Sequence, residues 1–330
     1  MLLLDRQDVA ALLPMAECMT AVERAFAAYS TGRLAAEPAV LGTHVESGGF
    51  HVKAAVIGEN PGYYAAKINA NFPGNPARRG LPAIQGVIAL FDVATGQPLA
   101  LLDSTEITVL RTAAASAIAA RHLARADAST LLICGCGTQG RAHLRAFMLV
   151  RPLRRVLAYD LDPGLARRFA DEMSAECGIA VEAVASLADS FPHCDIGVTC
   201  TPARVALLAA GDVRPGQFIA AVGADSEGKQ ELDPQILRKT RVVADVAGQA
   251  ARMGELQHAL AARLMTMDDL HAELGQVIAG LRPGRTSDQE IFVFDSTGTA
   301  LQDVAAAAVV YERARALRRG TEVSLSGVAA

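Results

Sequence analysis

Gly135-Cys136-Gly137-Thr138-Gln139-Gly140 is the stretch of sequence that decides the fold. It follows the apolar run Thr130–Cys134 and opens a segment with helical spacing, and a second apolar run, Val156–Tyr159, is followed by Asp160. In such a strand–turn–helix unit the glycines permit a tight turn, a close approach of backbone to a pyrophosphate, and close packing of helix on strand. The pattern predicts dinucleotide binding, with phosphates at the helix N-terminus and Asp160 on a ribose diol. The alternative is a glycine-rich turn that binds nothing.

The bulk composition indicates a globular protein and argues against nucleic-acid binding. A chain of 330 residues favours two domains, and its 51% hydrophobic and 20% charged content is ordinary for packed cores. The net charge is −4 and the pI is near 6.0, so no basic surface for nucleic acid is indicated. Aromatic residues make up only 5% and tryptophan is absent, which disfavours base stacking.

The six cysteines lack the paired spacing of metal ligands, so we expect free core thiols and no metal centre. The N-terminus, Met1–Arg6, becomes charged too early for a secretory signal. No apolar run approaches the length of a membrane span. We therefore expect a cytoplasmic protein without membrane association.

The first part of the chain is predicted to combine a helix with a meandering sheet. Short apolar runs separated by Gly/Pro turns occupy the region from Ala39 to Asp103, and an alanine-rich helix, Ile107–Ala124, follows. The expected elements are a strand at 2–4, a helix at 15–30, strands at 50–56, 63–69 and 84–91, and loops at 58–62 and 72–82. This part, 1–120, is expected to be an α+β domain.

The second part, 121–302, alternates strands with helices. Such alternation implies a parallel sheet with right-handed crossovers, hence an α/β, Rossmann-type doubly wound domain. The expected strands are 130–134, 155–160, 196–199, 218–222, 242–244 and 291–294, with helices at 138–150 and 163–176. A last helix begins near Asp303, and the segment 303–330 is expected to return to the first domain.

Polar and small residues follow several of these strands. In a doubly wound sheet the ligand lies at the carboxyl ends of the strands, so these residues are expected to outline one crevice. With the glycine turn and Asp160, the candidate cofactor residues are Thr112, Gly135, Gly137, Thr138, Gln139, Gly140, Thr199, Thr201, Pro202, Val222, Gly223, Ser296 and Gly298. Asp225, in Gly223-Ala224-Asp225, is expected at the same edge.

Three basic residues of the first domain are candidates for an anion site. Lys53 and Lys67 lie inside apolar strands, and Arg111 lies in the alanine-rich helix. Strand alternation permits an exposed face for the lysines, and an ordinary salt bridge is the alternative for Arg111. If they face the substrate instead, the guanidinium holds a carboxylate, and a desolvated lysine acquires a lowered pKa suited to proton transfer.

Taken in order, these motifs resemble the ornithine cyclodeaminase/μ-crystallin family over most of the chain. The resemblance rests on Asn71–Pro76, Gly80-Leu81-Pro82, Asp103, Thr108, Arg111–Ala114, the glycine turn, Gly223-Ala224-Asp225 with Gly228-Lys229 and Glu231-Leu232, and Ser296-Thr297-Gly298 with Gln302-Asp303. It implies a Rossmann-type domain and a substrate domain that also forms a homodimer. By position, Lys67 matches the active-site lysine, Arg111 the carboxylate-binding arginine and Asp225 the cyclodeaminase acid.

The resemblance implies one of three functions, and the first is a nicotinamide-dependent oxidoreductase of small α-amino or α-imino acids. Pro38 is followed by Ala39, where cyclodeaminases usually carry an arginine, and a basic residue occurs instead at His51 or Lys53. This departure favours an amino-acid dehydrogenase or an imine or ketimine reductase. The second alternative is a cyclodeaminase that releases ammonia, and the third is a non-catalytic nucleotide-dependent binding protein. Asp160 favours NAD, with NADP as the alternative because Arg167 and Arg168 follow.

Overall fold

The computed structural model describes residues 1–33, 38–58 and 61–325, which divide into two compact units. Unit 1 comprises Met1–Arg111 and the C-terminal segment from Thr299, and unit 2 comprises Thr112–Gly298. The first division falls inside helix α4 (Ser104–Leu123), and the second falls just before helix α12 (Ala300–Leu317).

Unit 1 is built on a seven-stranded sheet in the order β17-β1-β6-β5-β4-β3-β2. Strands β2 to β6 pair antiparallel with their sequence neighbours, which confirms the predicted meander, and β1 joins β6 in parallel. The strands are β1 (Leu2–Leu4), β2 (Ala39–Val45), β3 (Gly48–Ile57), β4 (Tyr63–Asn71), β5 (Ile84–Asp92), β6 (Pro98–Asp103) and β17 (Thr321–Glu322).

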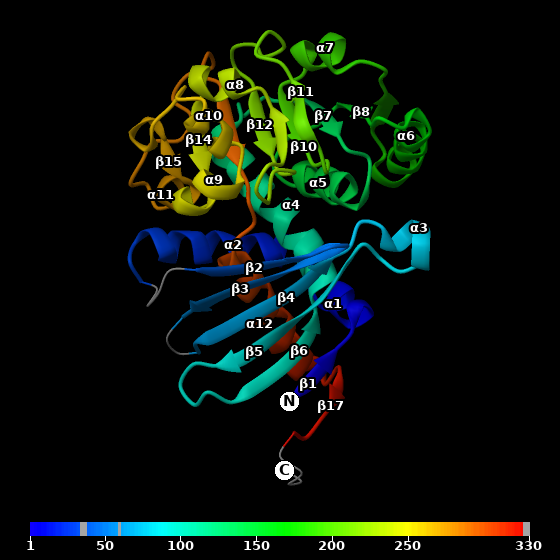
Figure 1. Cartoon of the computed structure of the whole chain (residues 1–330), viewed down its shortest axis with the longest axis vertical. Coiled ribbons are helices and arrows are strands. Elements are labelled where there is room, and N and C mark those ends of the chain that lie inside the picture. The colour runs from blue at the N-terminus through cyan, green and yellow to red at the C-terminus, as the bar shows by residue number, and fades with distance from the viewer. Residues whose placement is uncertain (34–37, 59–60, 326–330) are drawn as a thin grey trace. The chain divides into compact units, whose positions relative to one another are not determined.

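The two faces of this sheet differ. Helix α12 packs across β3, β4 and β5, and α1 (Arg6–Leu12) and α2 (Met15–Ser30) pack against α12 (Figure 1). Because side chains alternate along a strand, Lys67 points toward the helix-covered face and Ile68 points away from it. We call the opposite side the open face, defined by the exposed apolar residues Leu3, Leu41, Phe50, Tyr64, Ile68 and Val87.

Two local predictions in unit 1 are wrong. The expected loop 72–82 contains a short helix, α3 (Asn75–Arg79), because Pro76 is tolerated in a first helical turn and Gly80, with φ +64°, ends it in the left-handed conformation. The alanine-rich helix begins at Ser104, where the carboxylate of Asp103 accepts a hydrogen bond from the N–H of Glu106 (2.9 Å). The helix therefore starts before the predicted first residue, Ile107, and Arg111 lies well inside it.

Unit 2 contains an eight-stranded parallel sheet in the order β15-β14-β16-β12-β10-β7-β8-β9, which confirms the doubly wound prediction (Figure 1). The strands are β7 (Thr130–Cys134), β8 (Arg155–Tyr159), β9 (Ala180–Ala183), β10 (Ile196–Thr199), β12 (Phe218–Ala221), β14 (Arg241–Ala244), β15 (Ala272–Glu273) and β16 (Phe292–Asp295). The chain leaves β7 in one direction for β8 and β9 and returns to β10 on its other side. This reversal is the switch point at which such sheets bind ligands.

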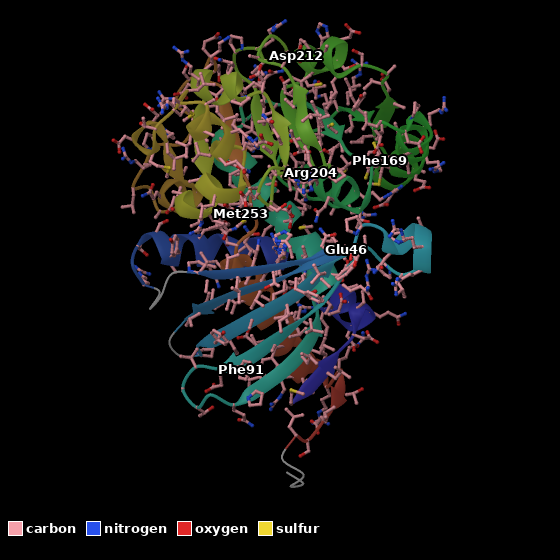
Figure 2. The ribbon with its side chains drawn as sticks, viewed as in Figure 1. Glu46, Phe91, Phe169, Arg204, Asp212 and Met253 are labelled. Atoms are coloured by element: carbon pink, nitrogen blue, oxygen red, sulfur yellow. The ribbon has the colours of Figure 1, made fainter. Side chains whose placement is uncertain are left out.

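Helices cover the sheet of unit 2 and bury its central strands. They are α5 (Thr138–Met148), α6 (Pro163–Cys177), α7 (Leu187–Ser190), α8 (Pro234–Lys239), α9 (Ala247–Met253), α10 (Leu256–Ala261) and α11 (Leu274–Ile278), and β11 (Arg204–Leu208) pairs with β13 (Gln230–Leu232) beside them. Phe169 on α6 (labelled in Figure 2) is fully buried. The Arg141 guanidinium lies 5.5 Å from the centroid of its ring. Within the described residues, no helix is both long and apolar enough to cross a membrane.

The glycine turn joins β7 to α5 with little spare space. Gly135 has φ +106°, a conformation that favours glycine, and its N–H donates to the carbonyl of Tyr159 (2.9 Å). A Cβ added at Gly140 would lie 2.3 Å from the carbonyl oxygen of Gly135. At Gly137, which caps α5, an added Cβ would meet nothing within 4 Å.

We predict that Gly140→Ala destabilises unit 2 by about 1–3 kcal/mol, because its methyl group overpacks the turn against backbone. Gly137→Ala is the matched control, and its free energy of unfolding should stay within about 1 kcal/mol of the wild type. Urea denaturation of the two variants measures this. Equal stability of the two variants would show that the turn is looser than described.

Candidate active site

The glycine turn and Asp160 are joined in unit 2. One carboxylate oxygen of Asp160 accepts a hydrogen bond from the N–H of Cys136 (2.9 Å), and the other accepts from the N–H of Asp162 (3.0 Å). This carboxylate, at the end of β8, is therefore fixed beside the turn. Thr138 and Gln139 form the first turn of α5, where N–H groups lack partners within the helix.

Backbone hydrogen bonds continue the sheet beyond the ends of its central strands. The N–H of Cys200 donates to the carbonyl of Cys134, that of Val222 to Thr199, and that of Ser296 to Ala221, each at 2.9 Å. The structure therefore brings the ends of β7, β10, β12 and β16 to one edge of the sheet, as predicted.

The other predicted cofactor residues of unit 2 lie at this edge or near it. Thr201 and Gly223 are bound by the same carboxylate, Glu231, and Gly298 donates from its N–H to Asp245 (2.7 Å). Pro202 is exposed next to Thr201, and Thr112 is buried in α4.

Two observations favour a bound polar ligand at this edge. The space beside Gly137 stays open to an added Cβ, although the neighbouring glycines are tightly packed. In addition, the Oγ atom of Ser296 and the Oε1 atom of Gln139 are buried without a hydrogen-bond partner in the described part of the chain. Buried polar atoms are rarely left unsatisfied, so a bound polar group is a natural partner for them.

Asp225 follows the same edge but is half exposed. Its carboxylate forms an ion pair with the ammonium of Lys229 (2.6 Å), four residues further along the sequence in the same loop. Lys229 is itself anchored, because its carbonyl oxygen lies 2.7 Å from Nε2 of His258.

A buried charge cluster lies in unit 1, between β4, α4 and α12. Nζ of Lys67 lies 2.7 Å from Oδ2 of Asp303, and Nε of Arg111 donates to Oδ1 of the same carboxylate at 2.9 Å. Arg111 also donates from Nη1 to Oε1 of Gln302 (2.8 Å). Lys67 and Arg111 are each 4% exposed and Asp303 is 1% exposed, so the cluster is almost completely desolvated.

Burial and charge act in opposite directions on this cluster. Burial lowers the pKa of Lys67 to about 7; Asp303 opposes the shift, while Arg111 and Lys53 add to it. Burial by itself would raise the pKa of Asp303, but the charges of Lys67 and Arg111 outweigh it and hold that pKa below its usual value. Lys67 thus exchanges its proton near neutrality beside a carboxylate that stays ionised.

Lys53 and His51 share the face of Lys67. Lys53 is directly opposite Lys67 in the antiparallel pair β3–β4, and His51 is opposite Asn69. Residues directly opposite in such a pair project to the same side of the sheet. The exposed-face alternative for the two lysines is therefore wrong.

Sequence reasoning missed the role of Asp303. The residue was part of a motif, yet only the fold shows that it joins two basic residues that are distant in sequence. The available signal was an acid within the apolar run Ala300–Ala308, which is costly to bury without a basic partner.

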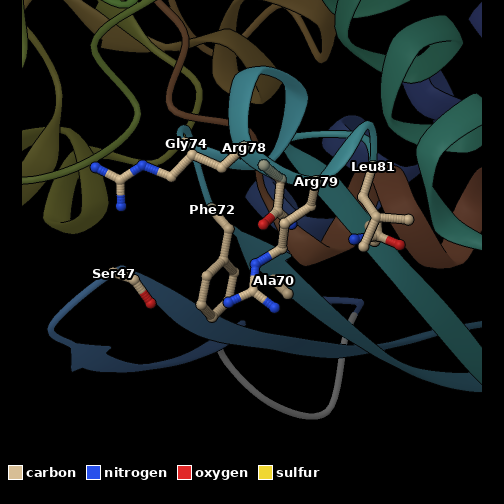
Figure 3. A pocket seen from close by; sticks show the side chains of 9 residues that line it. Ser47, Ala70, Phe72, Gly74, Arg78, Arg79 and Leu81 are labelled. Carbon is tan, nitrogen blue, oxygen red and sulfur yellow. The ribbon is translucent and has the colours of Figure 1, made fainter.

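A separate hollow of about 310 Å³ lies at the loop around α3 and contains none of the predicted site residues. Figure 3 shows Arg79 reaching toward Phe72, while Arg78 extends away from it. Its lining residues are Ser47, Ala70, Phe72, Gly74, Asn75, Arg78, Arg79, Leu81 and Gln85. We assign no role in the active site to this hollow.

We predict that Asp303→Asn lowers the free energy of unfolding by about 3–5 kcal/mol, because two buried cations lose their counter-charge. Asp171→Asn is the matched control, since this carboxylate is exposed on α6, and its effect should stay within about 0.5 kcal/mol. Urea denaturation compares the two. An equal effect of both substitutions would contradict the description of the cluster.

The chain is similar to known proteins over nearly its whole length. The model of the ornithine cyclodeaminase/mu-crystallin family matches residues 1–318. An alanine dehydrogenase of Archaeoglobus fulgidus is 40% identical over 322 residues, which cover 98% of each chain. The structure of an archaeal alanine dehydrogenase dimer with bound NAD superposes with a TM-score of 0.92 at 40% identity, over 98% of this chain and 99% of that one.

A third relative was solved with cofactor and an amino acid. It is the Delta(1)-pyrroline-2-carboxylate reductase of Thermococcus litoralis in complex with NADH and L-proline, with a TM-score of 0.93 and 34% identity over 98% of this chain and all of that one. Matches of this extent and identity establish common descent. The chain belongs to the ornithine cyclodeaminase/mu-crystallin family.

Proposed function

We propose that this chain is an NAD-dependent oxidoreductase of small α-amino or α-imino acids, working as an amino-acid dehydrogenase or an imine reductase. The observation that carries the proposal is the buried Lys67–Asp303–Arg111 cluster, which combines a proton-exchanging lysine with a carboxylate-binding arginine. Alanine dehydrogenase and pyrroline-2-carboxylate reductase among its relatives support this reaction class.

The edge of the unit 2 sheet is proposed to hold the cofactor. The pyrophosphate is assigned to the glycine turn and the first turn of α5, and the adenosine ribose to Asp160. Further contacts are assigned to Thr112, Thr199, Thr201, Pro202, Val222, Gly223, Ser296 and Gly298. NAD is preferred over NADP because the carboxylate of Asp160 repels a 2′-phosphate, and relatives were solved with NAD and NADH.

Arg111 is proposed to hold the substrate carboxylate. Its Nε and Nη1 atoms each donate one hydrogen bond to α12, and the remaining N–H groups of the guanidinium suit a carboxylate. Lys53 and His51, on the same face of the sheet, are assigned to the same anion. Because Asp303 and Gln302 fix the guanidinium, little conformational entropy is lost when substrate binds.

Lys67 is proposed as the general acid and base. A bound nicotinamide supplies or accepts the hydride at the α-carbon of the substrate. The Lys67 ammonium donates a proton to the nitrogen of an imine during reduction, and the amine form accepts one during oxidation. A pKa of about 7 makes both forms available near neutrality. Asp225, held by Lys229, is proposed to orient the substrate amino group.

Two alternatives share these residues. A cyclodeaminase would regenerate NAD in each turnover and release ammonia, whereas a dehydrogenase changes the NADH concentration. A non-catalytic binding protein would bind NADH without turning over any amino or imino acid. The absence of an arginine after Pro38 and the similarity to an alanine dehydrogenase favour the dehydrogenase or reductase.

The open face of unit 1 is proposed to join two copies in a homodimer. It presents six exposed apolar residues on one continuous sheet surface, a pattern typical of an interface. A relative of known structure is a dimer. A cytoplasmic location is proposed because all six cysteines are free, as in a reducing compartment.

We predict that Lys67→Met lowers turnover by about 10²-fold or more while NADH affinity is retained, because this lysine is assigned a proton transfer and no contact with the cofactor. Wild-type kcat/KM for imine reduction should fall as the pH rises through about 7, and that for amino-acid oxidation should rise. NADH absorbance with a panel of amino and keto acids plus ammonia measures both. Lys239→Met, on the exposed side of α8, is the control. Undiminished turnover in the Lys67 variant would refute the role of this lysine.

We predict that Ile68→Glu converts the proposed dimer to a monomer, because a symmetric interface on the open face would bury an unpaired carboxylate from each copy. Light scattering coupled to size exclusion gives the mass. Val205→Glu is the control, since Val205 is an exposed apolar residue of β11 in unit 2. A dimeric Ile68→Glu variant would show that the open face is not the interface.

A further inference from the structure

One buried carboxylate in unit 2 holds two loops of the proposed cofactor site. Glu231, in β13, is fully buried. Its Oε1 atom accepts hydrogen bonds from the N–H (2.6 Å) and the hydroxyl (2.7 Å) of Thr201, and its Oε2 atom accepts from the N–H of Gly223 (2.8 Å). The loops that follow β10 and β12 therefore share a single anchor.

The packing around Glu231 leaves no space for a side chain at Gly223 or Gly135. A Cβ added at Gly223 would lie 2.3 Å from the carbonyl oxygen of Thr201 and 2.4 Å from the carboxyl carbon of Glu231. A Cβ added at Gly135 would lie 2.9 Å from the carbonyl oxygen of Cys200. The loop after β10, which Glu231 holds, therefore packs directly against the glycine turn.

Glu231 is itself anchored by two further buried acids. Its N–H donates to Oε1 of Glu255 (2.7 Å), and the N–H groups of Glu255 and Leu256 donate to the carboxylate of Asp295 at 3.0 and 2.9 Å. In the described part of the chain no lysine or arginine forms an ion pair with these acids. They are satisfied by backbone N–H groups, which fix loops rather than neutralise charge.

We propose that Glu231 is a positioning residue for nicotinamide-dinucleotide binding, acting through Thr201 and Gly223. The inference rests on the proposed function, because it requires that the edge of the unit 2 sheet binds NAD. Glu231 does not contact the cofactor in this account, since its two oxygens already accept three hydrogen bonds from the protein.

We call the three hydrogen bonds from Thr201 and Gly223 to the Glu231 carboxylate the clamp, and protonation of Glu231 weakens it. A protonated carboxyl group carries a hydrogen where three donors need acceptors, so one bond is lost. Burial raises the pKa of Glu231, and the ionisable groups that interact with it are Glu255, Cys134 and Cys200. Because the pKa is raised, the ionised clamp is present above that pKa and is lost as the pH falls through it.

The test is the dissociation constant of NADH, measured by fluorescence titration, for Glu231→Gln and for the control Glu182→Gln. The amide turns its NH₂ group toward a loop N–H, so the constant should rise about 10- to 100-fold. Glu182 is an exposed acid on β9, and its substitution should leave the constant unchanged. At saturating NADH, kcat should fall by a smaller factor than the KM for NADH rises.

Two further measurements separate positioning from general stability. Wild-type affinity for NADH should weaken as the pH falls, and Glu231→Gln should flatten this dependence. If that variant does not fold, Thr201→Val, which loses one donor, should raise the constant several-fold, and Thr201→Ser should restore it. Unchanged affinity in Glu231→Gln, or in Thr201→Val, overturns the clamp while the proposed function stands. A wild type that does not bind NADH overturns both.

Discussion

The proposed chemistry depends on the two ion pairs that the carboxylate of Asp303 forms with Lys67 and Arg111. Asp303 lies on α12 and contacts Lys67 on β4 and Arg111 on α4, so one buried charge unites three elements that are far apart in sequence. Two cations could not be buried there without it, because desolvation of each costs several kcal/mol. Since burial outweighs the attraction of Asp303, the Lys67 proton remains exchangeable near neutrality.

In unit 2 the loops are held in place mainly by hydrogen bonds to backbone N–H groups rather than by ion pairs. Its glycine turn and strand-end loops are held by backbone hydrogen bonds and by carboxylates that accept from N–H groups, with glycines where any side chain would collide. Burial raises the pKa of Glu255 to about 9 and that of Asp295 to about 7. Burial therefore disfavours the ionised form of both acids near neutral pH. The proposed substrate chemistry and the proposed cofactor binding thus depend on separate sets of buried charges, one in each unit.

Much of the fold could be predicted because its signals are local. The glycine turn between two apolar runs specifies a strand–turn–helix unit, and the Gly/Pro turns before Asp103 specify a meander. Helix α3 was not foreseen, because Pro76 and Gly80 occur both in loops and at helix ends. The start of α4 depended on the carboxylate of Asp103, a single hydrogen bond that composition does not reveal.

The site was predictable only as a set of residue types. Alternation along β4 left two faces open to Lys67, and only its pairing with Asp303 resolves which face it uses. Glu231 and Glu255 were equally hidden, since their partners come from other loops of the fold. The most direct test of the account is the titration of the Lys67 side chain, followed by NMR on lysine-labelled protein. A pKa of about 7 is expected, whereas a value near 10.5, usual for an exposed lysine, would contradict the buried cluster.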